Sequence, residues 1–128
     1  MKEKKISVLI VDDNFHYAKR MQVLLDELQN IYPVNIAGTY KDASEKLETQ
    51  DHDLVLLDIN LPDGNGMDLL KKINNPLQNK KRDVIMISNK ADAFYRNECK
   101  KLGAKYFLDK TNDFEKVADL LSGANGLS

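Results

Sequence analysis

The chain has 128 residues, 42% of them apolar and 30% charged, a composition typical of one folded domain rather than of a disordered segment. Its net charge of −1 gives no support to a general attraction to nucleic acid or to membranes. The single cysteine, Cys99, excludes an intramolecular disulfide and a zinc site built from several cysteines. No apolar run is as long as a signal-peptide core or a transmembrane helix, so we expect a cytoplasmic domain.

The first strand and helix are expected in the N-terminal quarter of the chain. Residues 6–11 form a nearly continuous β-branched run, which is typical of a strand buried on both faces, and Asn14 can cap the helix that follows. Apolar residues then recur at steps of three and four, which predicts the side of the helix that faces the core. This stripe consists of Phe15, Ala18, Met21, Leu25 and Leu28.

Strands and helices continue to alternate along the rest of the chain. We expect strands at 34–38, 53–57, 83–87 and 105–108, and helices at 41–49, 67–73, 91–102 and 114–121. The segment LPDGNG (61–66) is typical of a turn, and the tail 122–128 is expected to fray. Five strands alternating with five helices predict an α/β domain with a parallel sheet covered on both faces.

Polar side chains stand where four of these strands end. Asp12 and Asp13 follow the first strand, Asp58 the third, Ser88 the fourth and Lys110 the fifth. Ligands of such sheets bind beyond the carboxyl ends of the strands, so these side chains are expected at one site. Two carboxylates about 4 Å apart repel by roughly 4 kcal/mol at an effective dielectric constant near 20, and a hard cation such as Mg²⁺ would offset that repulsion.

The chemistry of these groups suits phosphoryl transfer. A divalent cation and an ammonium neutralise charge on a transferring phosphoryl group, a hydroxyl can hydrogen-bond it, and a carboxylate can accept it. Each residue alone has a common structural explanation, such as helix capping or surface exposure, and only their joint placement favours a site. His16 and His52 fit no such pattern and are expected at the surface, and Cys99 is expected to be partly buried.

Four segments, VLIVDDN, DLVLLDINLPDGNG, VIMISN and GAKYFLDK, together resemble the receiver domains of two-component response regulators. The resemblance covers residues 4–121 and identifies the chain as a single receiver (response regulatory) domain over 1–128. It implies a flavodoxin-like (βα)5 fold with the strand order 2-1-3-4-5, as in CheY.

The resemblance also assigns roles to the polar residues of the site. Asp58 matches the phosphoacceptor, and Asp12 and Asp13 match the acidic pair that holds Mg²⁺ together with Asp58. Asn60 matches the position whose backbone carbonyl completes the metal site. Lys110 matches the lysine that contacts the phosphoryl group, so Asp58, Ser88 and Lys110 would carry the reaction.

Further positions match the switch and the turn of the family. Ser88 matches the switch hydroxyl and Phe107 the switch aromatic, while Pro62 and Gly66 match the turn after the phosphoacceptor. Lys90 matches a position that influences how fast the phosphoryl group is lost.

The chain departs from the family pattern after Lys110. Family members usually have a proline there, often after a cis peptide bond, but here Thr111 follows. A cis bond before a residue other than proline costs about 2.5–4 kcal/mol, so we expect a trans bond.

The resemblance implies a sensor histidine kinase or a histidine phosphotransfer protein as the phosphodonor. Phosphorylation would change the surface made by the fourth helix, fifth strand and fifth helix, through which the domain would bind an effector or form a homodimer. The domain would catalyse its own phosphorylation and dephosphorylation as a signalling domain rather than a metabolic enzyme. Direct nucleic-acid binding and membrane association are not expected of it.

A docking surface for the kinase is expected on the first helix. Tyr17, Arg20 and Leu24 share one side of that helix, and Tyr17 would lie near the mouth of the site. The alternative is that Tyr17 and Leu24 form the buried margin of the core stripe.

The sequence also bears on functions other than that of a receiver. A phosphatase of the haloacid dehalogenase type carries its nucleophilic Asp after the first strand and a second Asp two residues on, whereas here the acidic pair comes first and position 60 is Asn. A flavin-binding carrier needs a phosphate loop that DDNFHY does not supply, and a degenerate receiver would lack some of the site residues. The receiver can stand alone or belong to a longer regulator, such as a DNA-binding transcription factor.

Overall fold

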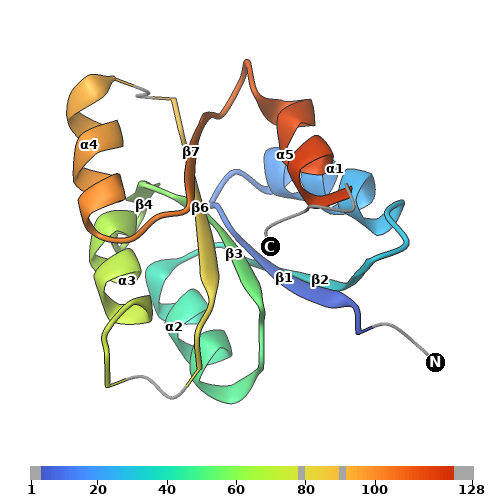
Figure 1. Cartoon of the computed structure of the whole chain (residues 1–128), viewed down its shortest axis with the longest axis horizontal. Helices are drawn as coiled ribbons and strands as arrows, with labels where there is room; N and C mark the ends of the chain where they lie inside the picture. The colour runs from blue at the N-terminus through green and yellow to red at the C-terminus, as the bar shows by residue number, and fades with distance from the viewer. Residues whose placement is uncertain (1–3, 78–79, 90–91, 123–128) are drawn as a thin grey trace.

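The fold is built on one parallel β-sheet. The computed structural model describes residues 4–77, 80–89 and 92–122. Within these residues, five strands form a parallel sheet in the order β2-β1-β3-β6-β7 (Figure 1), which confirms the predicted flavodoxin-like order. The strands are β1 (Ile6–Val11), β2 (Ile31–Ala37), β3 (Leu54–Asp58), β6 (Asp83–Ser88) and β7 (Tyr106–Asp109).

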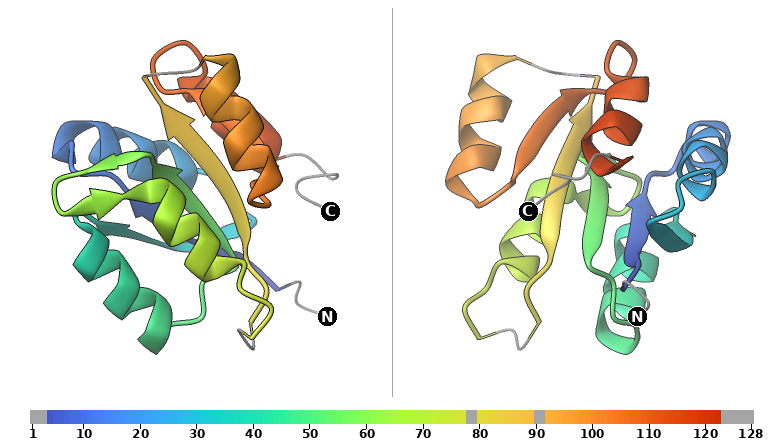
Figure 2. Two further views of the ribbon diagram at one scale, coloured as in Figure 1. Left: turned by 90° about the vertical axis from the view of Figure 1, so that its left-hand side faces the viewer. Right: turned by 45° about the vertical axis from the view of Figure 1, so that its right-hand side comes forward.

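Helices cover both faces of this sheet. Figure 1 shows α1 and α5 on one face and α2, α3 and α4 on the other, and the left view of Figure 2 has these three helices in front of the strands. In the described part of the chain, no helix has the length and apolarity needed to cross a membrane. The helices are α1 (Phe15–Asp26), α2 (Tyr40–Thr49), α3 (Gly66–Ile73), α4 (Ala93–Lys101) and α5 (Phe114–Ser122).

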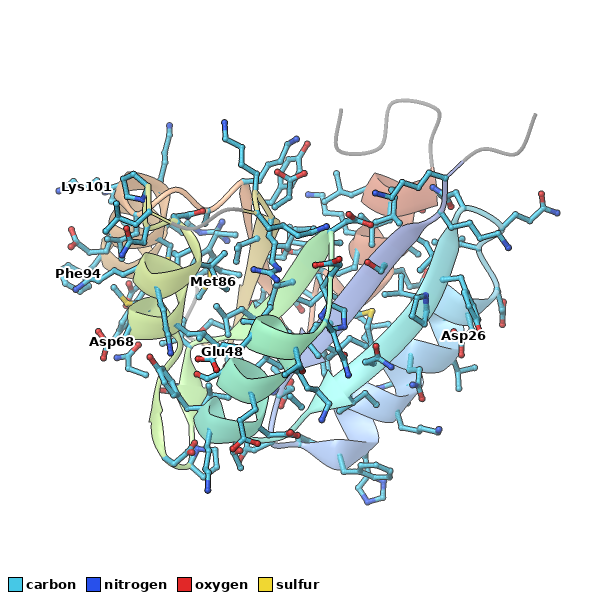
Figure 3. The ribbon with its side chains drawn as sticks, turned by 90° about the horizontal axis from the view of Figure 1, so that it is seen from below. Asp26, Glu48, Asp68, Met86, Phe94 and Lys101 are labelled. Carbon is cyan, nitrogen blue, oxygen red and sulfur yellow. The ribbon has the colours of Figure 1, made fainter. Side chains whose placement is uncertain are left out.

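The sheet separates two hydrophobic layers, which explains why its strands are apolar throughout. Val8 and Ile10 of β1 pack in the layer with α1 and α5, whereas Leu9 packs in the layer with α2, α3 and α4. Met86 of β6 lies inside the second layer, and Phe94 lies at the periphery on α4 (Figure 3). Alternate residues of a strand point to opposite faces, so a strand covered on both sides needs an apolar residue at every position.

The largest differences from the predicted elements lie at the second strand and at the expected turn. The second strand begins at Ile31 rather than at residue 34, because Ile31 pairs with Ile6 before an irregularity shifts the register to Val8 and Val34. The expected turn at 61–66 contains a two-stranded antiparallel hairpin of β4 (Asn60–Leu61) and β5 (Gly64–Asn65).

The buried side of α1 also differs from the predicted stripe. Phe15 is 64% exposed, whereas Tyr17 is buried together with Ala18, Met21 and Leu25. Phe15 is the first residue of α1, and its exposed ring contacts only the neighbouring ring of His16 among the aromatic contacts of the described residues. The alternative in which Tyr17 belongs to the margin of the core is therefore correct.

The prediction of a surface position for His52 is wrong. Its side chain is 2% exposed, and its Nε2 lies 3.0 Å from Asn35 Oδ1. The Arg82 guanidinium covers the same region and donates hydrogen bonds to the carbonyls of Leu47, Gln50 and His52. Arg82 thus fixes the backbone at His52 from a position 30 residues later in the chain.

Cys99 is fully buried rather than partly buried. It lies on α4 and packs in the layer between the sheet and α2, α3 and α4. Burial raises the pKa of its thiol to about 11, so it is a small core side chain and not a reactive thiolate.

The chain enters α5 without the proline that is usual in the family. Within the described residues the one cis peptide is Tyr32–Pro33, so the bond between Lys110 and Thr111 is trans, as predicted. Asp109 Oδ1 accepts hydrogen bonds from the amides of Thr111 and Asn112 at 2.9 and 2.8 Å, which closes the turn in place of a proline ring.

Some predictions fall near or beyond the limits of the described residues. The fourth helix was expected from residue 91, but α4 begins at Ala93, after the N-cap Asp92. Lys90 lies outside the described residues, as do 123–128 of the expected tail. Ser122, placed in that tail by the sequence, is the last residue of α5.

Candidate functional site

Strand register brings the predicted site residues to one edge of the sheet. Val11 of β1 pairs with Leu57 of β3, so the next residues, Asp12 and Asp58, stand at the same level. Asp58 in turn pairs with Ile87, which places Ser88 one residue further along β6.

Three carboxylates meet at this edge. Ligand atoms of Asp12, Asp13 and Asp58 lie within 4.8 Å of one another. Asp12 is 1% and Asp58 6% exposed, whereas Asp13 is exposed to solvent. The Oδ1 atoms of the two buried carboxylates accept backbone hydrogen bonds, from the Asn14 amide at 2.8 Å and the Asn60 amide at 3.2 Å. Their Oδ2 atoms therefore remain for other partners.

Lys110 bridges the two buried carboxylates. Its Nζ donates a hydrogen bond to Asp58 Oδ2 at 3.0 Å and lies 2.7 Å from Asp12 Oδ2. The contact with Asp12 is an ion pair, but it is not aligned as a hydrogen bond, so Asp12 Oδ2 keeps an unused acceptor direction. Lys110 is only 8% exposed, which is rare for a lysine without partners of opposite charge.

The pKa values of Lys110 and Asp12 are both raised above their ordinary values. Burial alone would lower the pKa of Lys110, but Asp12 and Asp58 raise it above its ordinary value, so the group stays charged. Burial raises the pKa of Asp12, and the opposing effects of Lys110 and the Asn14 amide do not cancel that rise. The Asp12 carboxylate would therefore gain from a second cation.

An open polar cleft lies above the cluster, with a volume of about 560 Å³. Its walls include Asp13, Asp58 and Lys110, but Asp12 and Ser88 lie below the surface that lines it. The remaining lining residues are Asn14, Asn60, Leu61, Pro62 and Asn89. The arrangement leaves the Asp58 carboxylate accessible beside a fixed ammonium.

Gly66 allows the hairpin to close against the cleft. Its amide donates to the Ile59 carbonyl at 2.6 Å, and a Cβ at this position would lie 2.0 Å from the carbonyl oxygen of Asp58. A larger residue would therefore displace the backbone of Asp58.

Comparison with known proteins identifies the family of the chain. The family model described as the response regulator receiver domain matches residues 8–122. The chain belongs to this family.

Relatives of this receiver domain agree with the assignment. The Fimbriae Z protein of Salmonella typhimurium is 36% identical over 124 residues, which are 94% of this chain and 58% of the relative. The transcriptional regulatory protein MalR of Bacillus subtilis is 32% identical over 117 residues, 91% of this chain and 49% of the relative. The receiver domain thus spans about half the length of the curated relatives it matches.

Solved structures agree with the fold. A CheY-like response regulator receiver domain protein from Methanospirillum hungatei is 26% identical, with a TM-score of 0.80. The match covers 91% of this chain and 90% of that structure.

The acidic edge fits the Mg²⁺ site that the family implies. Asp12, Asp13 and Asp58 offer the hard oxygen ligands that Mg²⁺ prefers, and Asp12 Oδ2 is buried with an unused acceptor direction. The Asn60 amide already folds back onto Asp58 Oδ1, which keeps residue 60 beside the cluster. The donor set therefore suits the ion.

The two predicted switch residues lie behind the cleft. Ser88 is fully buried, and its backbone carbonyl accepts a hydrogen bond from the Lys110 amide at 3.0 Å. Phe107 is half-buried, with the Arg96 guanidinium of α4 stacked 5.1 Å from its ring centroid. Arg96 also donates to the Phe107 carbonyl at 3.0 Å, so α4 holds both the ring and its backbone.

Sequence reasoning missed two residues of this region. Asn89 lines the cleft, and its place directly after Ser88 was the signal that could have revealed it. Tyr17 was expected near the mouth of the site, but its buried ring contacts Lys110 from below, 4.8 Å from Nζ to the ring centroid. The sequence carried no signal for that contact, because Tyr17 and Lys110 are far apart in the chain.

Proposed function

We propose that this receiver domain is a phosphorylation-activated switch of a two-component system, with Asp58 as the phosphoacceptor. The observation that carries the proposal is the Lys110 ammonium, which holds Asp58 Oδ2 at 3.0 Å on the floor of an open cleft. A reactive carboxylate beside a fixed positive charge is the arrangement that acyl-phosphate formation requires.

The phosphodonor is a histidine kinase or a histidine phosphotransfer protein. A carboxylate oxygen of Asp58 attacks the phosphorus of phosphohistidine, so that a P–O bond forms while the P–N bond breaks. The imidazole nitrogen leaves with the electron pair and takes a proton from solvent. Loss of the signal is hydrolysis, in which water attacks phosphorus and Asp58 leaves as a carboxylate.

The residues of the acidic edge and Lys110 neutralise charge on the phosphoryl group from two sides. Asp12, Asp13 and Asp58, with the carbonyl of Asn60, would hold Mg²⁺, which when bound neutralises charge on the transferring phosphoryl group. Lys110 neutralises charge from the other side, because its ammonium leaves Asp58 Oδ2 for a phosphoryl oxygen.

Ser88 and Phe107 carry the signal away from the site. The Ser88 hydroxyl donates a hydrogen bond to a phosphoryl oxygen, and the loop after β6 moves inward with it. Phe107 then leaves its place beside Arg96 and rotates inward, so α4, β7 and α5 present a changed surface to an effector or a second copy of the domain.

The kinase contacts the exposed first turn of α1. Because Tyr17 is buried, the exposed aromatic there is Phe15, which is 64% exposed and precedes the solvent-exposed His16. Val23, further along the helix, is also exposed and lines a shallow apolar groove between α1 and Phe114 of α5. Of the docking residues expected from the sequence, Tyr17 is excluded by its burial, whereas Arg20 and Leu24 line this same groove.

A receiver within a longer regulator is a second form of the same function. The match covers 58% and 49% of the lengths of Fimbriae Z protein and MalR, so those relatives carry further sequence beyond their receiver regions. In either form the reaction at Asp58 is the same.

Incubation with acetyl phosphate and Mg²⁺ tests the proposal. We expect intact-mass measurement to show one added, base-labile phosphoryl group on the wild type and none on Asp58→Asn. Asp53→Asn, which changes an acidic residue at the opposite end of β3, is the matched control and should still be modified. An equal signal from Asp58→Asn and wild type would exclude Asp58 as the acceptor.

A further inference from the structure

The buried ring of Tyr17 is a third partner of the site lysine. Lys110 Nζ lies 4.8 Å from the ring centroid, over its face, while the same ammonium contacts Asp12 and Asp58. An ammonium is attracted to the electron-rich face of an aromatic ring, and this attraction is stronger where water is excluded. Tyr17 is 9% exposed, so the contact is largely dry.

A second ring fixes the orientation of the first. Phe114 of α5 meets Tyr17 edge to face, with centroids 5.5 Å apart and an interplanar angle of 84°. The outer face of Phe114 is covered by the Arg20 guanidinium, whose Cζ lies 4.5 Å from the ring centroid. The Tyr17 ring is thus held from the side away from the cleft and cannot turn its face from Lys110 without breaking this packing.

The hydroxyl of Tyr17 plays no part in this arrangement. It is buried and makes no hydrogen bond within the described residues. A buried hydroxyl without a partner is destabilising, so the hydroxyl does not explain the position of the side chain. The position of the side chain is explained by the contacts of the ring and of its face.

We propose that Tyr17 is a positioning residue for Lys110. Its ring face holds the ammonium against Asp12 and Asp58, and keeps the long lysine side chain in one conformation. Lys110 therefore keeps its side-chain conformation when its ammonium leaves Asp58 Oδ2 for a phosphoryl oxygen. An aliphatic side chain of similar size would fill the same space without attracting the ammonium. The kinetic part of this inference rests on the proposed function, whereas the contact itself does not.

The contact is tested by NMR on the metal-free protein without a phosphodonor. In protein with ¹³C-labelled lysine, the Hε signals of Lys110, assigned by their loss in Lys110→Arg, should be displaced upfield by the ring. Tyr17→Phe should keep the displacement, and Tyr17→Leu should abolish it. Tyr32→Leu is the matched control, because the exposed Tyr32 ring lies 5.9 Å from Lys5 Nζ and should affect only Lys5. Undisplaced Lys110 signals in the wild type would overturn the inference.

The kinetic consequence is measured with acetyl phosphate and saturating Mg²⁺. We expect Tyr17→Leu to be phosphorylated about three- to thirtyfold more slowly, the factor that corresponds to loss of one buried cation–π contact. Tyr17→Phe, which keeps the aromatic ring, should be phosphorylated at a rate close to that of the wild type. If Tyr17→Leu proves poorly folded by its melting curve, Tyr17→Met replaces it with an unbranched aliphatic side chain.

The two failures are distinguishable. A folded Tyr17→Leu or Tyr17→Met variant that reacts at the wild-type rate would overturn the positioning role. Continued modification of Asp58→Asn would instead overturn the proposed function, and the NMR result on Lys110 would still stand.

Discussion

Lys110 contacts two of the three carboxylates at the site and leaves the charge of Asp13 to solvent. We predict that Asp13→Asn raises the melting temperature of the metal-free protein, because it removes one of three like charges within 4.8 Å. The same variant should lose much of the rise that Mg²⁺ produces in the wild type, a rise worth about 2.7 kcal/mol when the ion is a hundredfold above its dissociation constant. Thermal melts with Mg²⁺ and with chelator measure both effects. A lower melting temperature for metal-free Asp13→Asn would show that repulsion does not dominate.

His52 gives the fold a pH dependence. Its burial first, and then the nearby charge of Arg82, lower its pKa below the ordinary 6.5. The unfolded chain therefore binds a proton that the folded state does not, and stability falls as the pH drops below 6.5 toward the folded-state pKa. We expect His52→Gln to remove up to about 1.4 kcal/mol of the stability lost between pH 7.5 and 5.5.

Urea unfolding at the two pH values measures this difference. His16→Gln, which changes an exposed histidine, is the control and should keep the wild-type pH dependence. If His52→Gln and the wild type lost the same free energy of unfolding between the two pH values, His52 would not be the source of this pH dependence.

Single residues were predictable where strand order alone decides their position. The acidic pair, Asp58 and Lys110 follow strand ends, and any parallel sheet brings such positions together. Tyr17 and His52 were misplaced because their side chains contact partners distant in the chain, Phe114 for the first and Asn35 for the second. Local polarity around them gave no sign of those partners.

At the level of elements, Arg82 joins α2 to the strand that follows α3. Its guanidinium donates hydrogen bonds to three backbone carbonyls. Two of them, those of Leu47 and Gln50, lie at the C-terminal end of α2, where the helix dipole favours positive charge. We predict that Arg82→Met lowers the free energy of unfolding by about 2 kcal/mol, because three carbonyls, two of them in part-buried contacts, lose charge-assisted hydrogen bonds.

Denaturant unfolding measures the effect. Lys81→Met, at the exposed neighbouring position, is the matched control and should change stability little. Equal stability of the two variants would show that the capping contacts of Arg82 contribute nothing.

Elements were predictable from periodicity, and their ends were not. The alternation of apolar strands and amphipathic helices predicted the five main strands and the five helices of the described residues. The sheet order was predicted only from the resemblance to receiver domains. The start of β2 at Ile31 was not predicted, because Pro33 is typical of a strand end. The pairing of Ile31 with Ile6 nevertheless extends the strand. The β4–β5 hairpin was not predicted, because strands of two residues are too short to show a periodic pattern in the sequence.

At the scale of the whole molecule, the site and the proposed output surface lie at different places on one sheet. The site is at the carboxyl edge of β1 and β3, while β7 is the edge strand beyond β6, with α4 on one face of the sheet and α5 on the other (Figure 1). A charge change at Asp58 can reach that surface through β6, which ends at Ser88, and through its neighbour β7, which contains Phe107. A charge-assisted hydrogen bond is worth about 1.5–3 kcal/mol, enough to shift a two-state population tenfold or more.

The most direct test of this coupling compares backbone amide chemical shifts with and without beryllofluoride, a phosphoryl mimic, in the presence of Mg²⁺. In the wild type we predict changes at the site and also along α4 and β7. In Ser88→Ala we predict that the mimic still binds and shifts the amides near Asp58, but that most of the change at 93–101 and 106–109 is lost. A full wild-type pattern at those two segments in Ser88→Ala would contradict the proposed route from Asp58 through the hydroxyl to the aromatic ring.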